Sequence, residues 1–352
     1  MVDVGSERGG EPDTEAPREH RIVHVKPAPL VGSTLGGGAR FDRDDFQVRI
    51  GKTGRVDAQQ PVVRPHQRVT TAGPGWQAER ALAEGHCDLV GVVRGQIADP
   101  DFAAKARAGA TNDIRLCLSC NQECVGRMGL NRWLGCIENP RTGREALGVG
   151  LVRHPEARKD VMVVGAGPAG LQAAIAAARN GHRVTVFEQQ AEPGGQVRLA
   201  ASVPNRAEFG DMIRNQVAEC ERLGVAFEYG VGVWPGLVAE RAPHHVVIAT
   251  GAEASRPWWA PADATNVVDV RAVLDGSAPD GGPQAGQSVV VVDELGFHHA
   301  TSCAEVLADR GCHVEIVTNG MVVGQDLGIT LDMENWWMRA GSKGIVQSTD
   351  LV

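Results

Sequence analysis

The chain of 352 residues has room for two domains or slightly more, and its 43% apolar content is enough to fill sizeable cores. It carries 35 basic and 43 acidic residues and a formal net charge of −8, without a block of lysine and arginine. Nucleic acid is therefore not expected as a partner. The 44 glycines and 19 prolines indicate many tight turns or an irregular segment.

Residues 1–21 are polar and acidic and lack the apolar core of a signal peptide, so the sequence predicts a cytoplasmic protein. The longest uncharged run, 161–178, is about as long as a membrane span. Its first half contains three glycines and a proline, which favour a strand, a turn and a helix over a span. We therefore expect no membrane partner.

Residues 1–76 are rich in glycine and proline and poor in aliphatic residues, so this segment is predicted to be irregular and disordered. One isolated strand is possible at 45–56, because Phe46, Val48 and Ile50 alternate with polar residues. From residue 77 the apolar residues follow regular helix and strand patterns. A helix at 78–85, an apolar strand at 87–93 and a helix at 100–108 are expected there.

Two βαβ units are predicted further along the chain, and such units imply parallel strands. The pattern indicates an α/β fold with two Rossmann-like nucleotide-binding halves. The first unit comprises a strand at 160–164, a helix at 168–179 and a strand at 183–188, followed by a helix at 211–223 and a strand at 245–250; the second comprises strands at 289–292 and 313–316 around a helix at 301–310.

A dinucleotide fingerprint, G-x-G-x-x-G, lies between the first strand and helix, and reads Gly165, Ala166, Gly167, Pro168, Ala169, Gly170. The first glycine allows a tight turn, the second removes a side chain where a pyrophosphate approaches, and the third lets helix and strand pack closely. The helix N-terminus offers free N–H groups to the phosphates. Glu188, at the end of the next strand, suits the ribose hydroxyls. The alternative is a turn that binds nothing.

FAD and NAD share this fingerprint, so other segments must distinguish them. A glycine loop that includes Gly195 and Gln196 follows Glu188 and is placed to pass close to a ligand, although an ordinary turn is equally consistent with it. In the second unit Asp293, Leu295 and His298 stand where the first has its three glycines. A carboxylate there would repel a pyrophosphate. The second half either binds an adenine nucleotide weakly or only completes the fold.

Four cysteines lie in a segment, 112–144, that has no clear period and needs something other than an apolar core to organise it. Disulfides are not expected in a reducing compartment, so a metal is the first interpretation. Zinc usually takes two Cys-x2-Cys pairs and only one occurs here, whereas three thiolates from one loop and a fourth beyond it suit a [4Fe–4S] cube. Structural zinc remains the alternative. The candidate ligands are Cys117, Cys120, Cys124 and Cys136.

These motifs together resemble the old-yellow-enzyme-type flavin and iron–sulfur oxidoreductases, a family that includes 2,4-dienoyl-CoA reductase and trimethylamine dehydrogenase. The likeness runs from about residue 77 to the C-terminus, and residues 296–337 are most similar to a mycofactocin-associated branch. The residues that carry it are the run 88–100, Ile114 and Arg115 before the cysteines, Asn139 and Pro140 after them, 143–145, and the fingerprint turn.

The resemblance implies an NAD(P)H:flavin oxidoreductase. Electrons would pass between a nicotinamide nucleotide and a small organic substrate through FAD, a [4Fe–4S] cluster and an FMN held by a TIM barrel. In that pattern Arg94 follows the eighth barrel strand and contacts the FMN phosphate. A solvated arginine is the alternative.

The sequence departs from this family before residue 77. A TIM barrel takes roughly 250 residues, so we expect only its last βα unit here, no FMN held by this chain, and a gene product truncated at both ends. A non-catalytic FAD- and metal-binding fragment, or an electron-transfer module, is the alternative function. The expected parts are an irregular segment (1–76), a TIM-barrel remnant (77–112), an iron–sulfur segment (113–150), an FAD-binding half (151–287) and an incomplete second nucleotide-binding half (288–352).

Overall fold

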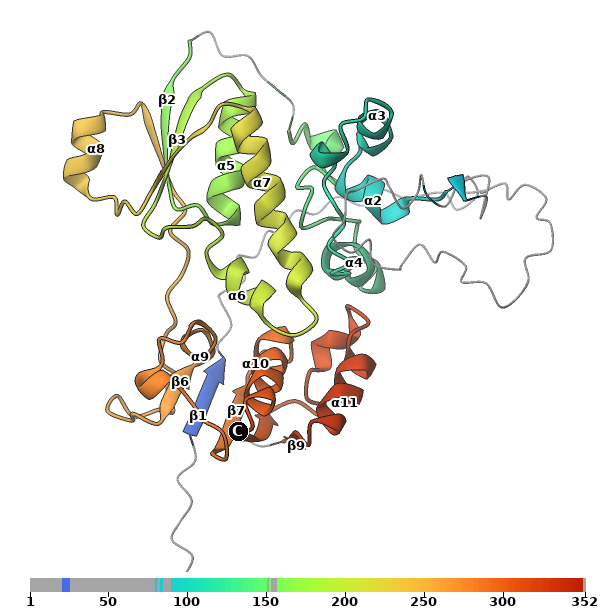
Figure 1. Cartoon of the computed structure of the whole chain (residues 1–352), viewed down its shortest axis with the longest axis vertical. Coiled ribbons are helices and arrows are strands. Elements are labelled where there is room, and N and C mark those ends of the chain that lie inside the picture. Colours follow the sequence, from blue (N-terminus) through green and yellow to red (C-terminus); the bar gives the residue numbers. More distant parts are fainter. Residues whose placement is uncertain are drawn as a thin grey trace, which may run out of the picture. The chain divides into compact units, whose positions relative to one another are not determined.

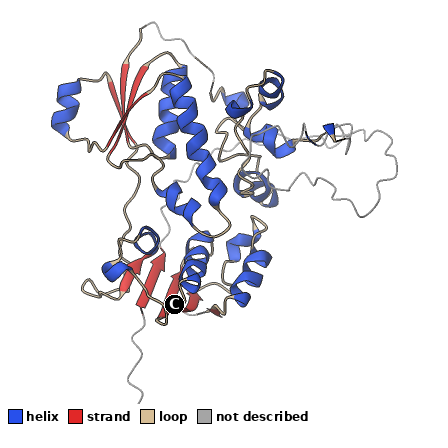
Figure 2. Cartoon of the chain, in the orientation of Figure 1, coloured by secondary structure: helices blue, strands red, loops and turns tan. Residues whose placement is uncertain are grey.

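The computed structural model describes residues 21–25, 80, 83–84, 90–150, 152 and 157–350. The chain divides into two units, one formed by residues 27–253 and the other by residues 1–26 together with 254–352. Each unit contains one parallel β-sheet with helices packed against it (Figures 1 and 2). The possible strand at 45–56 lies outside the described residues.

The unit formed by residues 27–253 has a four-stranded parallel sheet in the order β4-β3-β2-β5. The strand at 160–164, the helix at 168–179 and the strand at 183–188 have the predicted bounds. The strands are β2 (Asp160–Val164), β3 (Arg183–Glu188), β4 (Ala226–Tyr229) and β5 (His245–Ile248), and the helices are α5 (Pro168–Arg179), α6 (Gln196–Ser202), α7 (Gly210–Arg222) and α8 (Pro235–Arg241).

Helices α5 and α7 pack together on one face of this sheet, and α8 lies on the other (Figure 1). Helix α5 begins at Pro168, because proline's fixed φ suits the first helical position and its missing N–H is not needed there. Leu171 and Ile175 recur at helical spacing and are fully buried against Val163 and Val186 of the strands. This apolar layer holds the end of β2 and the start of α5 in a fixed relation.

Short helices and turns make up the same unit before β2. The predicted helix at 100–108 is confirmed as α3. The predicted strand at 87–93 is wrong where it is described, because residues 90–92 are not extended into a strand and α2 begins at Val93. No described strand pairs with them, and an unpaired strand would leave its backbone groups without partners. The elements are α2 (Val93–Ala98), α3 (Phe102–Arg107), α4 (Arg127–Gly129), the 3-10 turns η1 (Thr111–Asp113) and η3 (Glu145–Leu147), and the π-helical turn η2 (Gln122–Gly126). A further 3-10 turn, η4 (Ala207–Phe209), lies after β3, between α6 and α7.

The other unit has a five-stranded parallel sheet in the order β6-β1-β7-β8-β9. Helix α10 begins three residues before the predicted start at 301. The elements are β1 (Arg21–Val25), β6 (Val267–Asp269), β7 (Ser288–Asp293), β8 (His313–Thr318), β9 (Val346–Ser348), the helices α9 (Val270–Asp275), α10 (His298–Asp309) and α11 (Met333–Ser342), and the 3-10 turns η5 (Pro279–Gly281) and η6 (Gln325–Gly328).

Strand β1 is an element that the sequence pattern does not predict. It inserts between β6 and β7, and the backbone of Ile22 is in register with Val267 on one side and Val290 on the other. A strand from the N-terminal part of the chain thus completes a sheet whose other strands come from residues 267–348. The expected irregularity of residues 1–76 therefore does not extend to residues 21–25.

Burial at α5 gives a stability prediction. Replacing Leu171, which is fully buried, with alanine removes apolar contacts and leaves a cavity, so Leu171→Ala should lower the free energy of unfolding of its unit by about 2–5 kcal/mol. Leu147→Ala is the control, since that side chain is 68% exposed and its loss should cost within about 0.5 kcal/mol. If urea unfolding shows the same loss of unfolding free energy for both variants, the packing of Leu171 against the sheet is wrong.

Candidate functional site

The fingerprint turn joins β2 to α5, and two of its glycines are required by the chain's own packing. Gly165 has φ +102°, and a Cβ there would lie 2.4 Å from the carbonyl oxygen of Ala249. A Cβ on Gly170 would lie 1.9 Å from the carbonyl oxygen of Gly165. No side chain fits at either position, so these glycines are explained without any ligand.

Gly167 is different. Its φ of −74° is open to any residue, and a Cβ built there meets no atom within 4 Å. Packing within the chain therefore gives no reason for glycine at this position. A ligand that approaches the backbone does give one, because the second fingerprint glycine is the one on which a pyrophosphate lies.

A second predicted loop lies against this open position. A Cβ on Gly195, which has φ +51°, would be 3.5 Å from the Cα of Gly167, and the backbone N–H of Gly194 donates to the carbonyl of Ala166 over 2.9 Å. Gln196 donates its side-chain amide to the carbonyl of Ala252 over 2.9 Å. The structure thus brings the turn, the glycine loop and the segment after β5 together at the carboxyl ends of the strands, where ligands of such sheets bind.

Glu188 lies at the carboxyl end of β3, beside the turn. One carboxylate oxygen accepts from the backbone N–H of Ala166 over 2.8 Å, and the other accepts from Gln190 N–H over 2.9 Å. These two bonds fix the carboxylate next to the start of α5, within the part of the site where a ribose would lie. Pro168 and Ala169 form the first turn of α5, whose N-terminus favours anions. The residues present fit the adenosine diphosphate portion of FAD.

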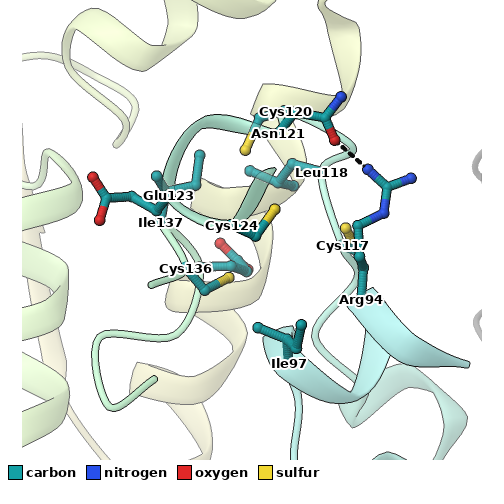
Figure 3. A pocket seen from close by; sticks show the side chains of 11 residues that line it. Arg94, Ile97, Cys117, Leu118, Cys120, Asn121, Glu123, Cys124, Cys136 and Ile137 are labelled. Carbon is teal, nitrogen blue, oxygen red and sulfur yellow. Dashed lines mark hydrogen bonds between the residues drawn. The ribbon is translucent and has the colours of Figure 1, made fainter. Parts of the chain in front are cut away.

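The four predicted cysteine ligands line one pocket (Figure 3). Cys117 and Cys120 lie in the loop after η1, Cys124 lies in η2, and Cys136 follows α4. The loop reverses at Asn121, which adopts a left-handed conformation with φ 56°. The backbone N–H of Gly135 donates to the carbonyl of Glu123 over 2.8 Å. This hydrogen bond holds the segment with Cys136 beside the segment with Cys124.

Burial governs the chemistry of these thiols. It raises the pKa of Cys120 to about 12, and it also raises the pKa values of Cys117 and Cys136, with the neighbouring cysteines adding to the shift. Without a metal ion at the site, these three thiols are protonated at neutral pH. Metal ligation would displace their protons. Among the described residues, no three His, Cys, Asp or Glu side chains are arranged to hold a single metal ion.

A buried polar junction, which the sequence pattern does not reveal, connects the cysteine segment to α7. Arg115 donates to the carbonyl of Glu138 over 2.8 Å and forms an ion pair with Glu219 on α7. The side-chain amide of Asn215 donates to the carboxylate of Glu138 over 2.5 Å. Burial raises the pKa of Glu138 to about 7. Of these residues, Arg115 is the one that belongs to the motifs that carry the family resemblance.

Arg94, the predicted phosphate contact, lies beside the cysteines. Its side chain lines the cysteine pocket and donates to the side-chain oxygen of Asn121 (Figure 3). Its expected contact with an FMN phosphate remains a prediction.

The second half has a different turn. Asp293, at the end of β7, is completely buried, and its carboxylate accepts from the backbone N–H groups of Leu295 over 3.1 Å and Gly296 over 2.9 Å. Burial raises the pKa of Asp293. The N–H groups of this turn therefore already have an anion-like acceptor from the chain itself, and the turn does not fit a pyrophosphate in the manner of the first half.

Comparison with known proteins identifies this domain. Residues 159–328 match the family described as pyridine nucleotide-disulphide oxidoreductase, which implies binding of a nicotinamide nucleotide. The chain is 37% identical over 243 residues to a probable N-methylproline demethylase of Rhizobium meliloti, covering 68% of this chain and 34% of that protein. It is 34% identical over 283 residues to N,N-dimethylglycine/sarcosine dehydrogenase of Chromohalobacter salexigens, covering 78% and 40%.

Solved structures agree with these matches. A 2-naphthoyl-CoA reductase complex superposes with a TM-score of 0.70 at 30% identity, over 78% of this chain and 40% of that one. Histamine dehydrogenase from Rhizobium sp. 4-9 gives 0.69 at 26% identity, over 77% and 43%. The chain thus contains a FAD/NAD-binding oxidoreductase domain related by partial homology to the old-yellow-enzyme-type flavin and iron–sulfur oxidoreductases, and it spans about a third to two-fifths of these relatives' length. Among the described helices, none has the length and apolar character of a membrane span.

The open space at Gly167 leads to a second prediction. Because a side chain fits there without a clash, Gly167→Val should fold with nearly unchanged stability but release no FAD on heating, since the new side chain fills the ligand's place. Gly341→Val is the matched control, because Gly341 also has open space for a side chain and lies on α11 in the other unit. Equal FAD yields from parent and Gly167→Val would refute the assignment.

Proposed function

We propose that this chain works in a flavin- and iron–sulfur-dependent oxidoreductase of the 2,4-dienoyl-CoA reductase and old-yellow-enzyme type. Electrons pass between a nicotinamide nucleotide and a small organic substrate by way of FAD and a [4Fe–4S] cluster. The observation that carries the proposal is that four cysteines line one pocket in the same unit as a fingerprint turn whose Gly167 is explained by a ligand and not by packing.

FAD is held by the first half of the fold. Gly165 and Gly170 shape the turn, and Gly167 leaves the backbone open to the pyrophosphate. The carboxylate of Glu188 accepts hydrogen bonds from the ribose, and the N-terminus of α5 stabilises the phosphate charge. The loop with Gly195 and Gln196 lies against the open position. When bound, FAD exchanges electrons in pairs with a nicotinamide and singly with a cluster.

The cluster is held by Cys117, Cys120, Cys124 and Cys136. The four side chains line one pocket, and three thiolates from one loop with a fourth from beyond it suit a [4Fe–4S] cube. Structural zinc remains the alternative. The loop reversal at Asn121 and the junction through Arg115 hold the ligands in place around it.

The organic substrate belongs to the whole assembly, of which this chain spans a part. The names of the relatives refer to N-methylproline, to dimethylglycine and sarcosine, and to 2-naphthoyl-CoA, which are small organic molecules of different classes.

A second candidate function is an electron-transfer module that exchanges no electrons with nicotinamide nucleotides. The buried carboxylate of Asp293 favours it, because the turn of the second half has its N–H groups occupied by the chain's own acceptor. In that case FAD would exchange electrons only with the cluster.

Substitution of one cysteine tests the cluster. Cys120→Ser should lose iron and acid-labile sulfide while retaining FAD, because the thiolates organise a segment that has no apolar core of its own. Protease sensitivity between residues 112 and 144 should rise with the loss. Cys312→Ala, in the other unit, is the control and should retain both groups. One zinc per parent chain without sulfide would contradict the assignment.

Reduction by nicotinamide nucleotides separates the two candidate functions. Under anaerobic conditions, NADH or NADPH should bleach the flavin absorbance of the parent chain, and Asp293→Asn should not slow the reaction, because the pyrophosphate does not depend on this turn. Flavin that dithionite reduces but neither nucleotide does would favour the electron-transfer module. Glu294→Gln is the charge-matched control for the Asp293 variant.

A further inference from the structure

Arg94 is the second residue of α2, and its guanidinium group reaches the loop that carries Cys120 and Cys124. It donates to the side-chain oxygen of Asn121, 27 positions later in the chain (Figure 3). Since Asn121 is a neutral acceptor, it fixes the guanidinium at the pocket without adding a negative charge there. Its left-handed backbone conformation points to a loop shaped around this position.

The rest of the pocket lining consists of the four cysteines, aliphatic side chains, Asn121 and two glutamates. Among the described residues that line it, Arg94 is the one cation, while Glu123 and Glu138 are carboxylic acids. Arg127 pairs with Glu123 over 3.0 Å from outside that lining. Four cysteine thiolates would add further negative charge. Arginine remains protonated in such surroundings, so its positive charge is permanent.

We propose that Arg94 faces the iron–sulfur cluster and that its fixed positive charge raises the cluster's reduction potential. This inference rests on the proposed function. An added electron makes a thiolate-bound cluster more negative, so a nearby cation stabilises the reduced form more than the oxidised form, and net charge is one of the properties that set cluster potentials.

Anaerobic redox titration of the full chain, followed by the spectroscopic signal of the reduced cluster, tests this role. Arg94→Gln should keep its iron and sulfide, and at a fixed potential near the parent's midpoint its reduced-to-oxidised ratio should fall about tenfold, which is about 59 mV for one electron. Arg241→Gln removes an equal charge from α8, where Arg241 pairs with Glu228, and should leave the potential unchanged.

A second variant keeps the inference testable if Arg94→Gln binds iron poorly. Asn121→Gly retains the arginine and the left-handed backbone but removes one acceptor of the guanidinium, and should lower the potential in the same direction by a smaller amount. A fully loaded Arg94→Gln with the parent's potential would overturn the inference alone. A parent chain without iron and sulfide would overturn the proposed function and this inference with it.

Discussion

The close approach of three backbone segments at the carboxyl ends of the strands is the constraint on which the first half of the fold depends. The carbonyl oxygens of Gly165 and Ala249 occupy the space that side chains on Gly170 and Gly165 would need. This packing brings the end of β2, the start of α5 and the segment after β5 to one place, and the buried layer of Leu171 and Ile175 keeps it there. A ligand then meets backbone N–H groups without having to order them, so less binding energy is lost to conformational entropy.

The cysteine segment is held in another way. Its described residues form no apolar cluster comparable to the layer beneath α5, and buried polar contacts connect the segment to α7. The guanidinium of Arg115 reaches both the backbone of Glu138 and the carboxylate of Glu219, while Asn215 bonds to the side chain of Glu138. Buried ion pairs of this kind add little net stability, but removing one partner leaves an uncompensated charge. Such contacts therefore specify where the cysteines lie relative to α7 more than they stabilise the fold.

Local patterns predicted the first βαβ unit to the residue, because its apolar periodicity, its proline and its glycines all act within a few positions of one another. They failed where the decisive contact is distant. Strand β1 pairs with residues more than 240 positions away, and although three of its five residues are aliphatic, no local motif points to those partners. Glu138 and Asn215 are 77 positions apart, and no motif joins them. The predicted strand at 87–93 was read from apolar composition alone, and strands also need partners.

The two halves use a carboxylate at the same kind of turn with opposite results. Glu188 comes from the neighbouring strand and bonds to the turn at Ala166, which leaves the space over Gly167 open. Asp293 comes from the strand that leads into its turn, and its carboxylate accepts two of the N–H groups there. The sequence predicted repulsion of a pyrophosphate by Asp293, and the structure adds direct competition for the same donors. A duplicated fold thus keeps one turn available for a dinucleotide and fills the other with its own side chain, because the acid comes from a different strand and the second turn lacks the fingerprint glycines.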